Sequence, residues 1–479
     1  MSSFKKFFKK KDINLNPNTN QSEFKRVLGP VDLIMMGIGA IIGAGIFVVT
    51  GNAASTVAGP AVILSFLIAG LCCMASGLCY GELSTMIPLS GGAYTYNYVI
   101  FGEIAAWLIG SLAVVGYIMV VALVASGWSG YLVSTLESFG FSLDYRFSNP
   151  FGSIIKLENG NELIGILNVP ATGLVLTTAI VLYFGIELSA IINAIVVTVK
   201  MTVLSMFIAI GIFNVDCSNW RPFIPENTGE WGIFGISGIL SGAALVLTAF
   251  NGYDAVACAA QETKNPQRDL PIGIIGSLII SAITYMLCAL VLTGLVNYKD
   301  LNVAQPIALA VTKMGMPWFA IIIKLGAVIG LSSVVLITTY VIVRILFAMV
   351  EDCLLPKFLG KCHAKYKTPH ILTIIVSSLI IIVTNFLELS YLVQLSNICI
   401  ILITISVCLA TILGRKIYPN IKREFKCPGM PIIPGSCIMM LLYLLLTMPD
   451  KNVYWQISLV IFFLLVIYIV SINKRKEIK

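Results

Sequence analysis

Long runs of apolar residues recur along this 479-residue chain, and they constrain its fold more than any other feature. A helix needs about 20 apolar residues to cross the hydrocarbon core of a bilayer. By this criterion the sequence predicts twelve spans, at 31–56, 59–86, 100–136, 169–187, 190–214, 234–262, 271–296, 317–350, 370–386, 389–414, 431–448 and 453–473. Only 11% of the residues are charged, whereas a soluble domain has about 25%. The chain is therefore predicted to be an all-α membrane protein whose helices lie in the lipid bilayer.

Lys and Arg residues gather in the segments on one side of these predicted spans. They occur in the N-terminal tail 1–26, in 357–367, in 415–426 and in 474–479. Because positively charged loops stay on the cytoplasmic side, both chain termini are predicted to be cytoplasmic. We expect an integral multi-pass protein of the plasma (cell inner) membrane, and we interpret the net charge of +8 as a topology signal and not as a nucleic-acid surface. The basic N-terminus lacks the apolar core of a cleaved signal peptide.

Two of the predicted spans are interrupted by glycine near their midpoints. The first contains Gly-Ala-Gly at 43–45, and the sixth contains Asn-Gly at 251–252. Counted from each interruption, five spans form a unit, which predicts repeats at 27–214 and 215–414 and two additional spans in 415–479. Interrupted helices at matching positions of two halves point to the binding site of a transporter. The alternative is that these glycines only allow neighbouring helices to pack closely.

An interrupted helix exposes backbone groups that can bind both charged ends of an amino acid. The N–H groups that begin its second half carry about half a positive charge, and we expect those of residues 43–45 to bind the carboxylate. The carbonyls that end its first half, together with those of the sixth span, are expected to bind the amine. Glycine suits such a site because the absent side chain lets a ligand approach the backbone. The candidate substrate-binding residues are Ile41, Gly43, Ala44, Gly45, Thr248, Ala249, Phe250 and Asn251.

Lys200 is the second informative feature, because it lies about nine residues into the fifth predicted span. That depth is roughly 14 Å, near the middle of the bilayer, where a lysine costs about 2.5–3.5 kcal/mol on insertion. One interpretation is structural: the ammonium joins backbone carbonyls of neighbouring helices. The other is proton coupling, in which Lys200 exchanges its proton as the substrate moves. Ser332 and Ser333 of the eighth span are expected to line the same polar site.

Other functional classes lack the residues that they require. The chain has only two histidines, and most of its 12 cysteines lie in apolar runs, where a thiol acts as a small hydrophobic group. The sequence shows no spacing typical of metal ligands, no nucleophile beside a base and no phosphate-binding loop. We therefore expect that the protein is not an enzyme and that it binds neither a metal nor another cofactor. A channel would require a continuous polar stripe or filter, whereas spans nine to twelve are almost wholly apolar.

Five motifs, in this order, are similar to motifs of one known family. They lie at 27–48, with VLGP and GIGAIIGAGIFV, at 80–96, at 127–131, with GWSGY, at 262–274, with ETKNPQRDLPIGI, and at 352–356, with DCLLP. Together they resemble the amino acid–polyamine–organocation (APC) superfamily of amino acid permeases, most closely its cationic amino acid transporter branch. The resemblance extends from about residue 27 to residue 430.

The resemblance implies a LeuT-like fold of two inverted five-helix repeats, with discontinuous helices 1 and 6 and alternating access to a site at the membrane midplane. It implies a substrate held by backbone groups, namely those of Ile41, Ala44, Gly45, Thr248, Ala249 and Asn251. In proton-coupled relatives a lysine of the fifth span stands where sodium-coupled relatives bind a sodium ion. Lys200 matches that position, which supports the proton-coupling interpretation.

Four positions depart from the pattern of that branch. Gly116 stands where relatives often have glutamate, Thr248 replaces a gating aromatic residue, Asn251 replaces an apolar residue, and Glu351 stands where arginine is usual. These departures leave the side chain of the substrate open. The predicted function is secondary active transport of amino acids, with proton-coupled symport as the expected mechanism. The alternative is an antiporter that exchanges an amino acid or amine for a related metabolite.

Overall fold

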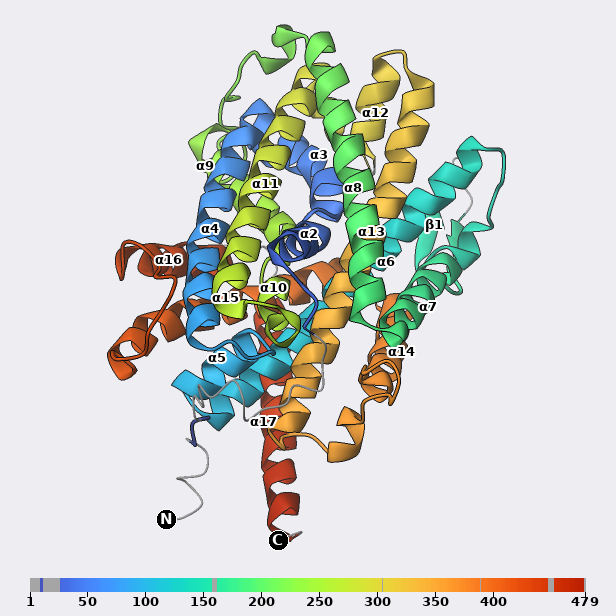
Figure 1. Ribbon diagram of the computed structural model, residues 1–479. Helices are drawn as coiled ribbons and strands as arrows, with labels where there is room; N and C mark the ends of the chain where they lie inside the picture. The colour runs from blue at the N-terminus through green and yellow to red at the C-terminus, as the bar shows by residue number, and fades with distance from the viewer. Residues whose placement is uncertain are drawn as a thin grey trace.

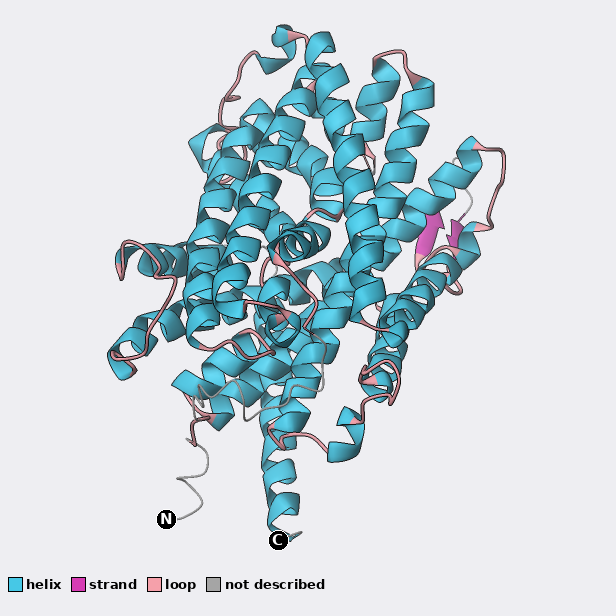
Figure 2. Ribbon diagram, in the orientation of Figure 1, coloured by secondary structure: helices cyan, strands magenta, loops and turns pink. Residues whose placement is uncertain are grey.

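The computed structural model describes residues 9–11, 26–156, 162–303, 305–387, 389–446 and 452–477. Most of the predicted N-terminal tail 1–26 therefore lies outside the described residues. The described chain is almost entirely helical (Figure 1 and Figure 2). It also contains one small antiparallel sheet, formed by β1 (Ile154–Lys156) and β2 (Glu162–Ile164), which the sequence did not indicate.

The helices cover each of the twelve apolar segments. In the first half of the chain they are α2 (Pro30–Ile41), the π-helical turn η1 (Gly45–Val49), α3 (Thr50–Ala53), η2 (Ala54–Ala58), η3 (Gly59–Ala61), α4 (Val62–Met86), α5 (Ala93–Ile100), α6 (Glu103–Ser138), η4 (Tyr145–Phe147), α7 (Val169–Phe184), α8 (Ile186–Gly211), η5 (Ile212–Asn214) and η6 (Cys217–Trp220). In the second half they are α9 (Gly235–Leu247), η7 (Thr248–Phe250), α10 (Ala255–Cys258), η8 (Ala260–Glu262), α11 (Pro266–Leu295), η9 (Tyr298–Leu301), α12 (Pro306–Lys313), α13 (Pro317–Glu351), η10 (Lys357–Gly360), α14 (His370–Phe386), α15 (Leu389–Ile417), α16 (Ile432–Leu446) and α17 (Asn452–Glu477).

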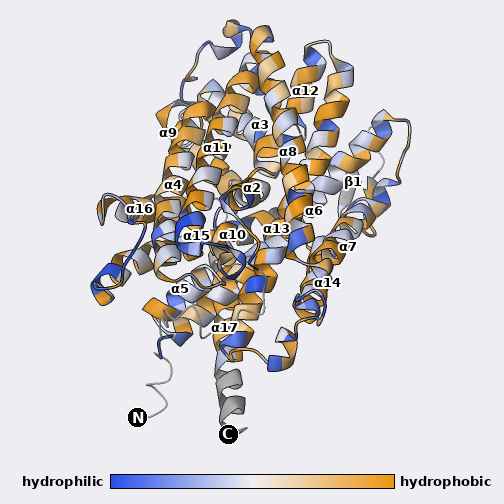
Figure 3. Cartoon of the chain, in the orientation of Figure 1, coloured by the Kyte–Doolittle hydropathy of each residue, from blue (hydrophilic) through white to orange (hydrophobic). Residues whose placement is uncertain are grey.

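The outer surface of this bundle is apolar. Ile180 on α7, Ile195 on α8 and Ile382 on α14 each expose more than half of their surface. Hydrophobic residues colour most of the length of the helices, and hydrophilic residues are most frequent at the loops (Figure 3). Seven helical stretches of the described chain are long and apolar enough to cross a membrane, and five shorter apolar helices of 10–17 residues accompany them. A surface of this kind is stable in lipid and not in water.

Local sequence explains where the main helices begin. Proline occupies the first position of α2, α11 and α13, where its missing N–H costs no hydrogen bond and its fixed φ angle suits a helix. At the start of α2 the N–H of Gly29 also donates to Asp32 Oδ2 over 2.9 Å. Asn168 caps α7 by accepting a hydrogen bond from the N–H of Ala171 over 3.1 Å.

The short helix α2 lies in the middle of the bundle, where Figure 1 places it between α8 and α11. It packs against both of these helices and against α13. The turns that follow α2 and α9, η1 and η7, contact each other. The two interrupted segments of the chain therefore meet inside the protein, enclosed by helices from both halves.

Candidate substrate and proton-coupling site

The first interruption frees the carbonyl groups at the end of α2. This helix ends at Ile41, and Ile42 has extended backbone angles of φ −77° and ψ 99°. Helical geometry resumes at Ala44 and continues into η1, which is wound as a π-helix. The last four carbonyls of an α-helix have no partner within the helix, so they require donors from elsewhere.

Lys200 supplies donors to two of these carbonyls and to the carbonyl of Ile42, the residue that follows the helix. Its side chain is fully buried, and its ammonium donates to the carbonyls of Ile38, Gly39 and Ile42 over 3.0, 3.1 and 2.8 Å. It also lies 2.9 Å from Ser333 Oγ. A cation at the C-terminal end of a helix is stabilised by the partial negative charge there. These contacts are those of the structural interpretation of Lys200, and they also place its ammonium directly beside the interruption, as proton coupling would require.

The two predicted serines behave differently. Ser333 lies 2.9 Å from the Lys200 ammonium and 2.9 Å from the Gly39 carbonyl, so it joins α13 to α2. Ser332 Oγ instead donates within its own helix, to the Ile329 carbonyl over 2.6 Å. Successive residues of an α-helix point about 100° apart, so one side chain of such a pair faces Lys200 and the other turns away. The expectation that both serines face Lys200 is corrected to Ser333 alone.

The second interruption follows α9. The turn η7 ends at Phe250, Asn251 is extended with φ −61° and ψ 143°, and Gly252 has φ +118°. Only glycine adopts this φ without strain. A Cβ at Gly252 would also lie 2.7 Å from the Cβ of Ala40, so the backbone of this turn packs directly on α2.

The two interruptions pack tightly against each other. A Cβ at Gly45 would lie 2.2 Å from the Cβ of Ala249 and 2.7 Å from its Cα. A Cβ at Gly43 would lie 2.8 Å from Val334 Cγ2. The absent side chain of Gly45 was expected to leave room for a ligand. In this structure the space is filled by the other interruption, which is the close-packing role that the sequence left as the alternative.

Tyr285, in the middle of α11, is a further residue of the site that sequence reasoning missed. Its fully buried hydroxyl lies 2.8 Å from the Ile41 carbonyl and 2.9 Å from the Ala249 carbonyl, one from each interruption. The sequence predicts that these carbonyls bind the amine of the substrate. The signal of Tyr285 in the sequence is a single tyrosine near the centre of the predicted span 271–296.

A cavity of about 750 Å³ reaches the second interruption. Thr248 and Asn251 of the predicted site line it, and α4, α9, α15 and α16 supply most of its wall. Ala249 and Phe250 are buried, and the Phe250 ring packs against Tyr285 with 5.1 Å between centroids. Ile41 and residues 43–45 do not line this cavity. The structure therefore brings the predicted residues together but opens only part of the set to a ligand.

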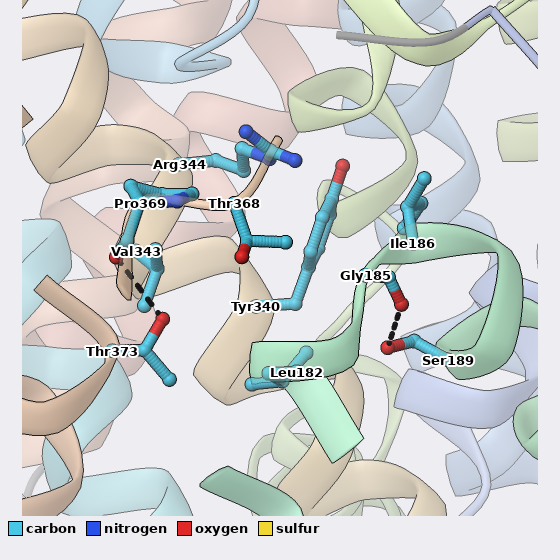
Figure 4. Close-up of a pocket in the computed structure, with 10 residues that line it drawn as sticks. All are labelled: Leu182, Gly185, Ile186, Ser189, Tyr340, Val343, Arg344, Thr368, Pro369 and Thr373. Carbon is cyan, nitrogen blue, oxygen red and sulfur yellow. Dashed lines mark hydrogen bonds between the residues drawn. The ribbon is translucent and has the colours of Figure 1, made fainter. Parts of the chain in front are cut away.

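A second pocket, shown in Figure 4, is too small for an amino acid. Its volume is about 20 Å³, which is room for one water molecule. Tyr340 and Arg344 of α13 line it together with Thr368 and residues of α8. Both α13 side chains contact the buried carboxylate of Glu262. The pocket therefore belongs to the packing around an ion pair.

Further ion pairs join helix ends on the side where α4 and α13 terminate. Glu82 lies 2.7 Å from Arg415 and 3.2 Å from Arg423, which links α4 to α15 and to the segment that follows it. Lys11 lies 2.7 Å from Asp352, which also accepts a hydrogen bond from the Tyr94 hydroxyl over 2.8 Å. Burial raises the pKa of Tyr94, and the nearby Asp352 acts in the same direction, so the hydroxyl stays protonated.

Within the described residues, no group of three or more His, Cys, Asp or Glu side chains is arranged to hold a metal ion. What the described residues do provide is an apolar bundle with two interrupted helices meeting at its centre and a cavity leading to one of them. This combination defines an integral membrane transport protein.

Comparison with known proteins gives the family. Residues 28–472 match the family described as amino acid permease, and the chain belongs to that family. It is 38% identical to the branched-chain amino acid permease BcaP of Bacillus subtilis (strain 168) over 465 residues, which cover 95% of this chain and 97% of the relative. It is 36% identical to the methylthioribose transporter of the same organism, over 90% of this chain and 91% of the relative.

A plant relative belongs among the cationic amino acid transporters, the branch that the sequence motifs resemble. The chain is 39% identical to the chloroplastic cationic amino acid transporter 9 of Arabidopsis thaliana, over 72% of this chain and 59% of the relative. The family and these relatives are transporters and not enzymes. The resemblance of the motifs to APC amino acid permeases, with cationic amino acid transporters among the relatives, is thus confirmed.

Proposed function

We propose that this protein is a secondary active transporter that moves amino acids by alternating access, as a proton-coupled symporter. The observation that carries the proposal is the meeting of two interrupted helices at α2–η1 and α9–η7. Backbone groups freed at such a point can hold a ligand with both a positive and a negative end. Membership of the amino acid permease family supports an amino acid as that ligand.

The substrate site is assigned to backbone groups of both interruptions. The N–H groups of residues 43–45 begin a helical stretch and bind the carboxylate. The carbonyls of Ile41 and Ala249, which the Tyr285 hydroxyl holds at 2.8 and 2.9 Å, bind the ammonium in its place. Because Gly45 packs on Ala249, substrate entry requires the two interruptions to separate. Thr248 and Asn251 lie on the path from the cavity.

One-sided access supports the alternating-access mechanism. The cavity opens beside η1 and the loop before α9, whereas the other ends of α4 and α13 carry ion pairs of Glu82 and Glu262. By the distribution of Lys and Arg, the closed side faces the cytoplasm and the cavity faces outward. Opening of the inner side would break these ion pairs, and closure of the cavity would bring η1, α9 and α15 together.

Lys200 is assigned to proton coupling, with Ser333 as its side-chain partner. Its ammonium holds three carbonyls of the α2 end. Loss of its proton removes the charge that holds this end, so α2 is free to move relative to α8 and α13. Protonation and movement of the first interruption are thereby linked, which is what a symporter requires.

The membrane topology of the proposal follows the sequence. Twelve spans form two inverted five-helix repeats of the LeuT type, at 27–214 and 215–414, followed by two further spans in 415–479. Both termini are cytoplasmic, and the protein resides in the plasma membrane. Neither a metal nor another cofactor is assigned. The relatives are named for branched-chain amino acids, methylthioribose and cationic amino acids, so the family alone leaves the side chain of the substrate open.

Uptake by the purified protein in sealed vesicles tests the function. Under an imposed inward proton gradient, labelled amino acid is expected to accumulate above its external concentration in vesicles that contain no substrate. A proton ionophore is expected to abolish this accumulation. Movement of label only when amino acid is present on the other side would instead identify the exchanger. No movement of any amino acid under either condition would refute transport of this substrate class.

A further inference from the structure

The wall of the 750 Å³ cavity carries polar groups but no charge. None of its lining residues, within the described chain, is Asp, Glu, Lys or Arg. Its polar side-chain groups are hydroxyls, thiols, carboxamides and the indole N–H of Trp231, and the remaining lining residues are apolar. A charged side chain that packs against such a wall loses hydration without gaining an ionic partner, and this loss of hydration costs free energy.

Two of the carboxamides, those of Gln394 and Asn397, come from one face of α15. Gln394, Asn397, Ile401 and Thr404 follow each other at intervals of three and four residues and all line the cavity. Residues at this spacing lie on the same face of a helix. The face therefore offers a mixed apolar and hydrogen-bonding surface to a side chain held at the second interruption, where Asn251 also lines the cavity.

Two further positions, Gly116 on α6 and Asp254 after η7, do not supply a carboxylate to the cavity wall. A Cβ at Gly116 would lie 2.6 Å from the Cβ of Cys399, so α15 occupies the space that an acidic side chain on α6 would need. Asp254, just after the second interruption, is partly buried and does not line the cavity. Its carboxylate accepts a hydrogen bond from the hydroxyl of Tyr117. Neither position presents a carboxylate to the cavity.

We infer that this site selects α-amino acids whose side chains carry no net charge and discriminates against lysine, arginine, aspartate and glutamate. The inference rests on the proposed function, because it assigns the side-chain pocket of the same site. Apolar and carboxamide side chains fit the wall, since its surface combines both kinds of group. The backbone groups at the two interruptions bind the α-carboxylate and the α-ammonium, which all amino acids have. The cavity selects among amino acids by their side chains.

A ligand panel on the purified full-length protein tests the inference. Thermal shift and competition binding are measured with leucine, methionine and glutamine, and with lysine, arginine and glutamate. The uncharged set is expected to bind at least tenfold more tightly than the charged set. Equal or tighter binding of lysine or arginine would overturn the inference and leave the proposed transport of amino acids standing. Binding of none of the six would overturn both.

Isosteric charge changes sharpen the test. Asn397→Asp and, independently, Gln394→Glu each place one carboxylate in the wall with almost no change in volume. Each is expected to raise the affinity for lysine relative to leucine by about tenfold or more, because the new carboxylate pairs with the ammonium of the lysine side chain. Asn214→Asp, on the exposed η5, makes the same change outside the cavity and is expected to leave the ratio unaltered. An unchanged ratio in both cavity variants would overturn the assignment of this wall as the side-chain pocket.

Discussion

Replacement of Tyr285 by phenylalanine removes one hydroxyl from the centre of the site and leaves the ring in place. That hydroxyl lies 2.8 Å from the Ile41 carbonyl and 2.9 Å from the Ala249 carbonyl. A buried acceptor that loses its donor costs about 1–3 kcal/mol. Tyr285→Phe is therefore expected to lower the free energy of unfolding by about 1–3 kcal/mol, which a lower thermal unfolding midpoint of the purified protein would report.

The same variant is expected to bind the substrate more tightly. In the proposed complex the substrate ammonium bonds the two carbonyls that the Tyr285 hydroxyl bonds in the free protein. The substitution therefore removes a hydrogen bond from the free protein but none from the complex. The affinity should then rise by about 5- to 150-fold, which corresponds to the same 1–3 kcal/mol. Equilibrium binding of labelled amino acid to the purified protein measures this change directly.

Tyr131→Phe is the matched control. Its hydroxyl is also buried and donates to a carbonyl of the first interrupted segment, that of Phe47, over 2.9 Å. This carbonyl is not part of the proposed amine site, so Tyr131→Phe should lower stability without raising affinity. If Tyr285→Phe weakens binding, the hydroxyl itself holds the substrate and the reasoning about competition is refuted.

Three further variants test neighbouring parts of the account. Lys200→Met should abolish the pH dependence of uptake while exchange of amino acid continues, and proton-driven accumulation equal to that of the wild type would contradict the coupling role. Gly45→Leu should abolish substrate binding because the new side chain displaces the second interruption, whereas Gly173→Leu on α7, where no atom lies within 4 Å of the added Cβ, should bind normally. Glu82→Gln should lower the thermal midpoint by removing the partner of Arg415, at a cost of up to about 3 kcal/mol. An unchanged midpoint would show that this pair contributes little to stability.

The helices could be predicted from the sequence because a chain in lipid must satisfy its backbone hydrogen bonds internally. In lipid, a run of about 20 apolar residues satisfies its backbone hydrogen bonds by forming a helix, and helices occupy all of these runs. The two interruptions could also be placed, since Gly-Ala-Gly at 43–45 and Asn-Gly at 251–252 fall near the midpoints of the first and sixth predicted spans. Lys200 was identified because an ammonium at that depth requires partners, which the end of α2 supplies.

The side-chain contacts of the site could not be predicted, because they depend on how each helix is rotated and packed against its neighbours. Neighbouring residues along the sequence do not determine this packing. Ser332 and Ser333 are neighbours with the same chemistry, and only the rotation of α13 decides which one meets Lys200. Tyr285 reaches both interruptions because α11 packs on α2. The contact between Gly45 and Ala249 joins segments about 200 residues apart along the chain. The sequence therefore identifies Gly45 but not Ala249, which occupies the space beside it.

The central claim is that backbone groups of two interrupted helices hold a zwitterion, and capped ligands test it most directly. The amino acid that binds best is compared, on the purified wild-type protein, with its N-acetyl derivative and its carboxamide. Each derivative keeps the side chain and loses one charged end. Since hydrogen bonds to charged groups are worth about 1.5–3 kcal/mol each and two or more are lost, affinity should fall by about 100-fold or more. Affinities within threefold of the free amino acid for both derivatives would contradict the account.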